Sequence, residues 1–154
     1  MLPIKHIIAG AIFSFLIYII FPAVGLFGAA LIFLASVFID ADHYIYYMLK
    51  YKDTNLKNAY KWFQELDRKV FNFQDKNPKL KIKNSLCFFH TFEFIFIILL
   101  LGFLYKPFLL IFLSLIFHSL FDMYDLGKRG VSKFREYSIL LYLNRKNKKG
   151  WYYF

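Results

Sequence analysis

The chain has 154 residues, enough for one domain, and its 59% hydrophobic content exceeds what a soluble core of this size requires, which favours a membrane protein. The single cysteine, Cys87, excludes an intramolecular disulfide and a thiolate-rich zinc site. The formal net charge of +10 suits nucleic acid or an anionic membrane surface, but the apolar segments favour the lipid bilayer, and we expect no specific nucleic-acid partner.

Four apolar runs predict an all-α fold, a four-span transmembrane helical bundle that forms a single membrane domain. The runs cover residues 7–21, 23–39, 86–105 and 107–121. The first run resembles a signal peptide, but the second follows almost at once, so we expect the first to be retained. Pro22 and Pro107 each separate two runs, because proline can begin a new helix but cannot continue one.

The segment between the second and third spans, residues 44–85, contains a predicted amphipathic helix. Apolar side chains recur at helical spacing from Leu56 to Val70, and basic side chains lie on the other face. Asp53 or Thr54 is the expected N-cap. This pattern predicts a helix in the membrane interface. A helix docked on the protein's own surface is the alternative.

Basic residues lie almost entirely on one side of this topology. Lys5, the segment 44–85 and the tail 123–154 together hold 19 of the 20 Lys and Arg, which leaves Lys106 alone on the other side. The positive-inside rule therefore predicts a multi-pass protein of the inner membrane with both termini in the cytoplasm. The tail stays open, because residues 132–143 fit a helix or a strand and residues 147–154 fit a hairpin.

The few polar residues at the ends of the predicted spans form one set. Its members are His6, Asp40, Asp42, His43, His90, Glu93, His118 and Asp122, and they include every histidine of the chain. Odd spans begin in the cytoplasm and even spans end there, so all of these residues lie at one membrane level. Ionisable groups bordering hydrocarbon are costly and usually have a partner or a function.

Helical spacing places these residues in pairs. His118 and Asp122 are four residues apart, and His90 and Glu93 are three apart, so each pair shares a helical face. Asp42 points about 200° away from Asp40 if the helix continues there. Imidazole and carboxylate ligands predict a divalent metal, with zinc as the first choice and manganese or iron as alternatives. The number of ligands suits one ion or two.

Other polar residues are left outside the predicted site. A single histidine or aspartate at a helix end is more often a cap than a ligand, and only the joint placement of the set favours metal. Cys87 is expected to pack as a small buried residue. In the tail, Asp125, Arg129, Arg135 and Glu136 are within reach, but charged tails are usually solvated.

Four motifs carry a family resemblance: HIIAG from His6, DADH from Asp40, FFHTFE from Phe88 and HSLFD from His118. They resemble the small membrane-bound predicted metal-dependent hydrolases, the family that includes the LexA-regulated inner-membrane protein of enteric bacteria. The resemblance implies that the histidines and aspartates of the motifs are ligands, whereas Glu93 comes from spacing alone. The motifs are more loosely similar to those of zinc-dependent phospholipase C.

The leading functional prediction is metal-dependent hydrolysis of an ester or phosphoester at the cytoplasmic membrane surface. Asp42 or Glu93 is the expected general base. A lipid headgroup or a lipid-linked intermediate is the expected substrate, because the site lies at headgroup level. Two alternatives stay open: a metal-binding or transport protein, and a structural membrane protein whose helix ends are joined by the metal.

Overall fold

The computed structural model describes residues 3–83 and 86–153, and the chain is mostly helical. The first helical hairpin joins α1 (Pro3–Ile20) to α2 (Gly25–Phe38) through the 3₁₀ turn η1 (Pro22–Val24). Gly25 has a φ of 63°, a left-handed conformation that favours glycine at this turn. This hairpin follows the sequence prediction closely.

The second hairpin consists of α5 (Phe92–Leu104) and α6 (Pro107–Lys128). The predicted span from residue 86 is shorter than expected, because Thr91 caps α5 by accepting a hydrogen bond from the Phe94 N–H at 3.3 Å. Residues before Thr91 therefore lie outside the helix. The 13 residues of α5 correspond to a length of about 20 Å.

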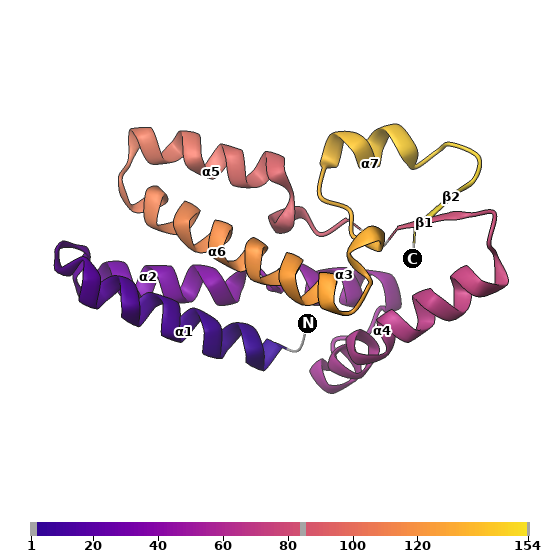
Figure 1. Cartoon of the computed structure of the whole chain (residues 1–154), viewed down its shortest axis with the longest axis horizontal. Coiled ribbons are helices and arrows are strands. Elements are labelled where there is room, and N and C mark those ends of the chain that lie inside the picture. The colour runs from indigo at the N-terminus through magenta and orange to yellow at the C-terminus, as the bar shows by residue number, and fades with distance from the viewer. Residues whose placement is uncertain (1–2, 84–85, 154) are drawn as a thin grey trace.

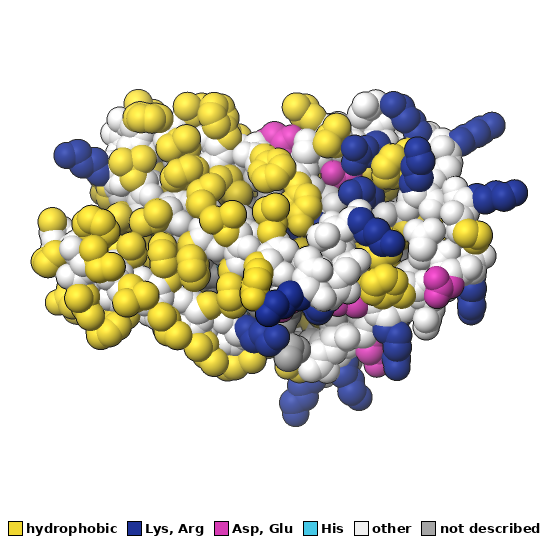
Figure 2. Space-filling model, viewed as in Figure 1, with side chains coloured by type: hydrophobic (Ala, Val, Ile, Leu, Met, Phe, Trp, Pro, Cys, Tyr) yellow, Lys and Arg dark blue, Asp and Glu magenta, His cyan; other side chains and the backbone are white. Residues whose placement is uncertain are grey.

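The four helices pack in the order α1, α2, α6, α5 (Figure 1). Two helical stretches, Pro22–Tyr51 and Pro107–Lys128, are long and apolar enough to cross a membrane, whereas Ile4–Ile20 and Phe92–Leu104 are apolar but shorter. Exposed hydrophobic side chains cover the half of the molecule that these helices form (Figure 2). The structure thus supports two candidate spans, and the four-span arrangement stays a prediction.

Small residues allow close approach within the bundle, as at Gly10 of α1. A Cβ atom added at Gly10 would lie 2.1 Å from Oγ of Ser36 in α2. The Ser36 side chain is buried, and its hydroxyl donates to the Phe33 carbonyl. The α1–α2 contact therefore requires a residue without a side chain at position 10.

The polar half of the molecule begins with α3 (Ala41–Tyr51) and α4 (Leu56–Lys76). Asn55, rather than Asp53 or Thr54, is the N-cap of α4, and its side chain accepts from the Lys57 N–H at 2.9 Å. Part of the apolar face of α4 is buried inside the protein, at Ala59, Trp62 and Val70. This arrangement corresponds to the alternative interpretation, in which α4 docks on the protein's own surface.

The tail contains η3 (Ser132–Phe134), α7 (Ile139–Arg145) and β2 (Trp151–Tyr153). Strand β2 pairs in parallel with β1 (Lys81–Lys83). The fold is therefore mostly helical but includes one pair of short strands, which the predicted all-α class lacks. The hairpin considered for residues 147–154 does not form over the described part, because Trp151–Tyr153 pairs with this distant segment instead. The tail is therefore attached to the central segment beside α4 (Figure 1).

Candidate metal centre

Seven of the eight predicted residues converge where the bundle meets the polar half. His6 lies near the start of α1, Asp40 between α2 and α3, His90 in the 3₁₀ turn η2 (Phe88–His90), and His118 in α6. The whole set that comes together is His6, Asp40, Asp42, His43, His90, His118 and Asp122. The structure thus brings these seven residues together at one place.

Three ligand atoms define the centre of the cluster. Asp40 Oδ1 lies 3.4 Å from His90 Nε2 and 3.5 Å from His118 Nε2. The two Nε2 atoms lie 3.3 Å apart. This small triangle of one carboxylate oxygen and two imidazole nitrogens is one of the groups that can hold a metal ion.

Hydrogen bonds on the opposite side of each ring set the tautomers. His118 Nδ1 lies 2.8 Å from the Ser36 carbonyl oxygen, which can only accept, so Nδ1 carries the proton. His90 Nδ1 lies 3.1 Å from Asp42 Oδ2 and is assigned as the donor on the same ground. Both Nε2 lone pairs therefore face the triangle, as they do in histidines that bind a metal.

Asp42 supports His90 and does not face the triangle. Its Oδ2 atom also accepts the Phe89 N–H at 2.9 Å, and the residue is buried. A carboxylate that holds the far nitrogen of a ligating histidine is a common second layer in metal sites. Asp42 therefore lies behind His90, whereas Asp40 faces the triangle.

Two further groups of potential ligands surround the triangle. His6, His118 and Asp122 form one, in which His6 Nε2 lies 3.3 Å from Asp122 Oδ1. Asp42, His43 and His90 form the other. Because these groups share His118 and His90 with the triangle, they extend one cluster and are not separate sites.

Glu93 does not join the cluster. Its carboxylate accepts hydrogen bonds from the Ser138 hydroxyl at 2.5 Å and from the Ile139 N–H at 3.1 Å, at the start of α7. The predicted pairing with His90 required both residues on one helix, but His90 precedes α5. Glu93 therefore joins the tail to α5 and lies away from the proposed ligands.

Arg135 and Glu136 belong to a charged tail that was expected to be solvated, but both are buried. Arg135 Nη2 lies 3.4 Å from Asp122 Oδ2, and Nη1 lies 3.5 Å from His43 Nε2. Burial lowers the pKa of Arg135, but Asp122 and Asp42 raise it more, so the pKa lies above its usual value. No local sequence signal distinguishes this arginine from the exposed basic residues of the tail, such as Lys133.

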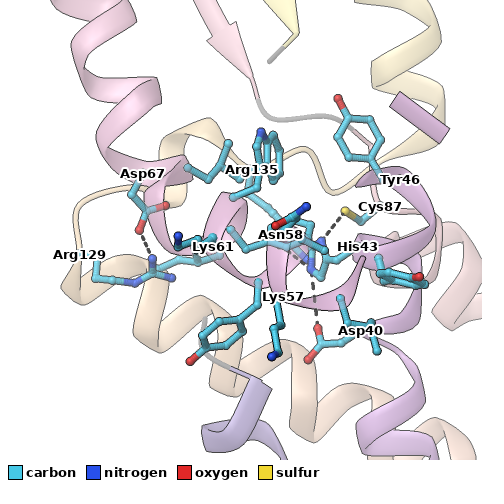
Figure 3. A pocket seen from close by; sticks show the side chains of 18 residues that line it. Asp40, His43, Tyr46, Lys57, Asn58, Lys61, Asp67, Cys87, Arg129 and Arg135 are labelled. Carbon is cyan, nitrogen blue, oxygen red and sulfur yellow. Dashed lines mark hydrogen bonds and ion pairs between the residues drawn. The ribbon is translucent and has the colours of Figure 1, made fainter. Parts of the chain in front are cut away.

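Cys87 also reaches the cluster, although it was expected only to pack. Its Sγ atom lies 2.9 Å from His43 Nδ1. On the other side of the ring, His43 Nε2 lies 3.6 Å from Asp40 Oδ1 (Figure 3). A guanidinium can only donate, so the nearby Arg135 is compatible with an unprotonated Nε2 and a protonated Nδ1 that faces the sulfur.

The charges of the cluster fit a divalent cation. Asp40, Asp42 and Asp122 contribute three carboxylates and Arg135 one guanidinium, which leaves two negative charges if the histidines are neutral. Buried charges without a counter-ion are costly. Several buried polar atoms here also have no hydrogen-bond partner among the described residues, namely His6 Nε2, Asp42 Oδ1 and Arg135 Nε.

A cavity of about 780 Å³ between α3 and α4 opens onto the cluster. Asp40, His43, Cys87 and Arg135 line its inner end (Figure 3). Comparisons with family models, with curated proteins and with solved structures found no match to this chain. The functional interpretation therefore rests on the geometry of the cluster and this cavity.

Proposed function

We propose that this protein is a membrane-embedded, metal-dependent hydrolase that acts on an ester or phosphoester at the cytoplasmic membrane surface. The observation that carries the proposal is the triangle of Asp40, His90 and His118, one member of which also lines the cavity. The proposal agrees with the sequence resemblance to small membrane-bound hydrolases.

The triangle suits zinc in particular. Ligands about 2.0–2.1 Å from a tetrahedral zinc ion lie about 3.3 Å from one another. The three distances within the triangle are 3.3, 3.4 and 3.5 Å. Zinc is therefore the first choice, with manganese or iron as alternatives. His118 Nδ1 already donates to the Ser36 carbonyl oxygen, so His118 has only Nε2 left for a metal. One ion is therefore sufficient.

A divalent ion held by these residues would polarise the carbonyl or phosphoryl oxygen of the substrate, and it would lower the pKa of a bound water molecule. The chain must then supply a group that takes up a proton. His43 lines the cavity, and with Nδ1 protonated toward Cys87 its Nε2 is the accepting nitrogen, 3.5 Å from the Arg135 guanidinium. We assign this role to His43, because the carboxylates of Asp42 and Glu93 are engaged elsewhere.

The proposed membrane position follows from apolar surface and charge. Exposed large hydrophobic side chains on α1, α2, α5 and α6 form a surface too extensive for a monomer in water, and we place all four helices in the bilayer. Basic residues gather on the polar half (Figure 2), and we place this half on the cytoplasmic side. A substrate at headgroup level reaches the cavity without leaving the membrane surface.

Hydrolysis assays on purified, zinc-loaded protein test the proposal. We expect turnover of a chromogenic phosphodiester, phosphomonoester or carboxylic ester that is lost on chelation and in His90→Ala, and retained in Asp75→Ala. Asp75 is exposed on α4 and distant from the cluster in sequence. If zinc binds stoichiometrically but no ester is cleaved, the enzyme proposal fails and a structural role for the metal is favoured.

A further inference from the structure

The cavity carries cationic side chains at two depths. Arg135 is buried at the inner end beside His43, whereas Lys57 and Lys61 are exposed on α4 (Figure 3). Its charged lining consists of Lys57, Lys61, Arg129 and Arg135 against Asp40 and Asp67. Positive charge is therefore in excess, and an excess of one sign in a cleft concentrates ligands of the opposite sign.

Arg135 retains hydrogen-bonding capacity at the inner end. Its contact with Asp122 is 3.4 Å long, compared with about 2.7–2.9 Å for a well-formed charged hydrogen bond. Its Nε atom is buried and has no hydrogen-bond partner among the described residues. A guanidinium presents its donors as a planar fork, which matches two oxygens of a phosphate group.

The surrounding structure holds Arg135 in place. Lys83 Nζ donates to the Arg135 carbonyl oxygen at 3.0 Å. The flanking residues are anchored as well, because Phe134 is buried in a core with Val70, and Glu136 accepts from Arg145 at 3.2 Å. A donor that is fixed before the ligand arrives loses little conformational entropy on binding.

At the outer end, Lys57 and Lys61 are one helical turn apart and form no close ion pair among the described residues, although Glu65 on the next turn attracts Lys61. Two like charges at this spacing destabilise a helix slightly. Arg129 differs from them, because it pairs with Asp67 and with Asp125. The two lysines are therefore the cations available to an incoming anion.

Most of the other lining residues are apolar or aromatic, and Asn58 is the polar amide among them. Leu56, Trp62, Phe63 and Leu66 line the cavity between its cationic ends. Its volume of about 780 Å³ exceeds the space that a phosphate group alone requires and is typical of sites for small organic molecules. The space suits a ligand that carries both an anionic and an apolar part.

We propose that this cavity binds a phosphate ester, with Arg135 contacting the phosphate oxygens and the apolar walls contacting the esterified group. This assignment names the substrate class of the proposed hydrolase and rests on that function for the reaction, whereas binding itself requires only the cationic groups. A lipid headgroup and a soluble phosphate ester share this chemistry.

The test measures equilibrium binding of two probes, phenyl phosphate and dihexanoyl phosphatidic acid, to detergent-purified full-length protein, with metal content determined for every sample. We expect Arg135→Lys, which keeps the charge but loses the fork, to weaken binding about 10-fold or more. The exposed pair Lys57→Gln with Lys61→Gln should weaken it about 3-fold in low salt. Lys79→Gln, an exposed change outside the cavity, should bind as wild type does.

Binding of the phosphatidic acid alone would identify a lipid headgroup as the source, and binding of both probes would identify phosphate esters in general. The proposal is overturned if wild type binds neither probe, or if Arg135→Lys or the double lysine variant binds as tightly as wild type. If the protein holds no metal but binds the probes through Arg135, the proposed hydrolase fails and the phosphate site stands.

Discussion

Single hydrogen bonds determine which nitrogen of each imidazole is available in the cluster. The Ser36 carbonyl accepts from His118 Nδ1, and the Asp42 carboxylate accepts from His90 Nδ1. These bonds leave both Nε2 atoms unprotonated and facing Asp40. In the opposite tautomers both Nε2 atoms, 3.3 Å apart, would carry protons and would have no lone pair to offer a metal ion. The residues behind the ligands are therefore as important to this site as the ligands.

This role for Asp42 leads to a graded prediction. Asp42→Ala should weaken zinc binding about 10 to 100-fold, because the His90 ring loses the acceptor that orients it, whereas loss of a direct ligand should cost more. Asp42→Asn retains an acceptor oxygen and should lie between Asp42→Ala and wild type. Competition against a chromogenic chelator gives the dissociation constants. Unchanged affinity in Asp42→Ala would show that His90 is not oriented this way.

At the scale of helices, close packing of α1 on α2 supports the site. Gly10 faces Ser36, and the carbonyl of Ser36 holds His118. A change at Gly10 therefore acts on the cluster through the backbone of α2. Gly127 of α6 offers a comparison, because an added Cβ there would meet no atom within 4 Å.

We expect Gly10→Ala to lower the free energy of unfolding by about 1–3 kcal/mol, because the methyl group displaces Ser36 from a packed contact. Gly127→Ala should raise it by up to about 1 kcal/mol, because alanine favours a helix more than glycine. Thermal or denaturant unfolding in detergent measures both. Equal effects of the two substitutions would contradict the close approach of α1 and α2.

Local periodicity was sufficient to predict α1, α2, α4 and α6, since each has its own run of apolar residues or its own apolar face. It did not give the start of α5, which the Thr91 cap determines, because the apolar run continues through that point. The strand pair was also not predictable locally, because β1 and β2 lie about 70 residues apart in the chain.

The same distinction applies to the candidate site. Histidines and aspartates were identifiable because such residues are uncommon beside long apolar runs, and the predicted alternation of spans would place them at one level. Glu93 was predicted as a ligand because it follows His90 by three residues, which would place both on one helical face. Helix α5 begins only at Phe92, so His90 and Glu93 do not share a helix. Arg135 depends on how the tail folds back onto α6, which no pattern within the tail indicates.

At the scale of the whole molecule, apolar and basic surfaces are segregated into two halves (Figure 2). This separation underlies the proposed orientation and predicts that α4 faces the cytoplasm. A cysteine introduced at Lys57, in a chain whose Cys87 is replaced by serine, should react with a membrane-impermeant reagent only after the cells are opened. Labelling from outside intact cells would contradict both the orientation and the cytoplasmic site.

Metal content per protein chain tests whether the buried cluster binds a divalent metal. Mass spectrometry of protein purified without chelators and then loaded with zinc should find about one ion per chain in wild type and in Asp75→Ala. His90→Ala and His118→Ala should each hold substantially less, because each loses a direct ligand. Wild type without stoichiometric zinc, manganese or iron after loading with each would show that the cluster is not a metal site.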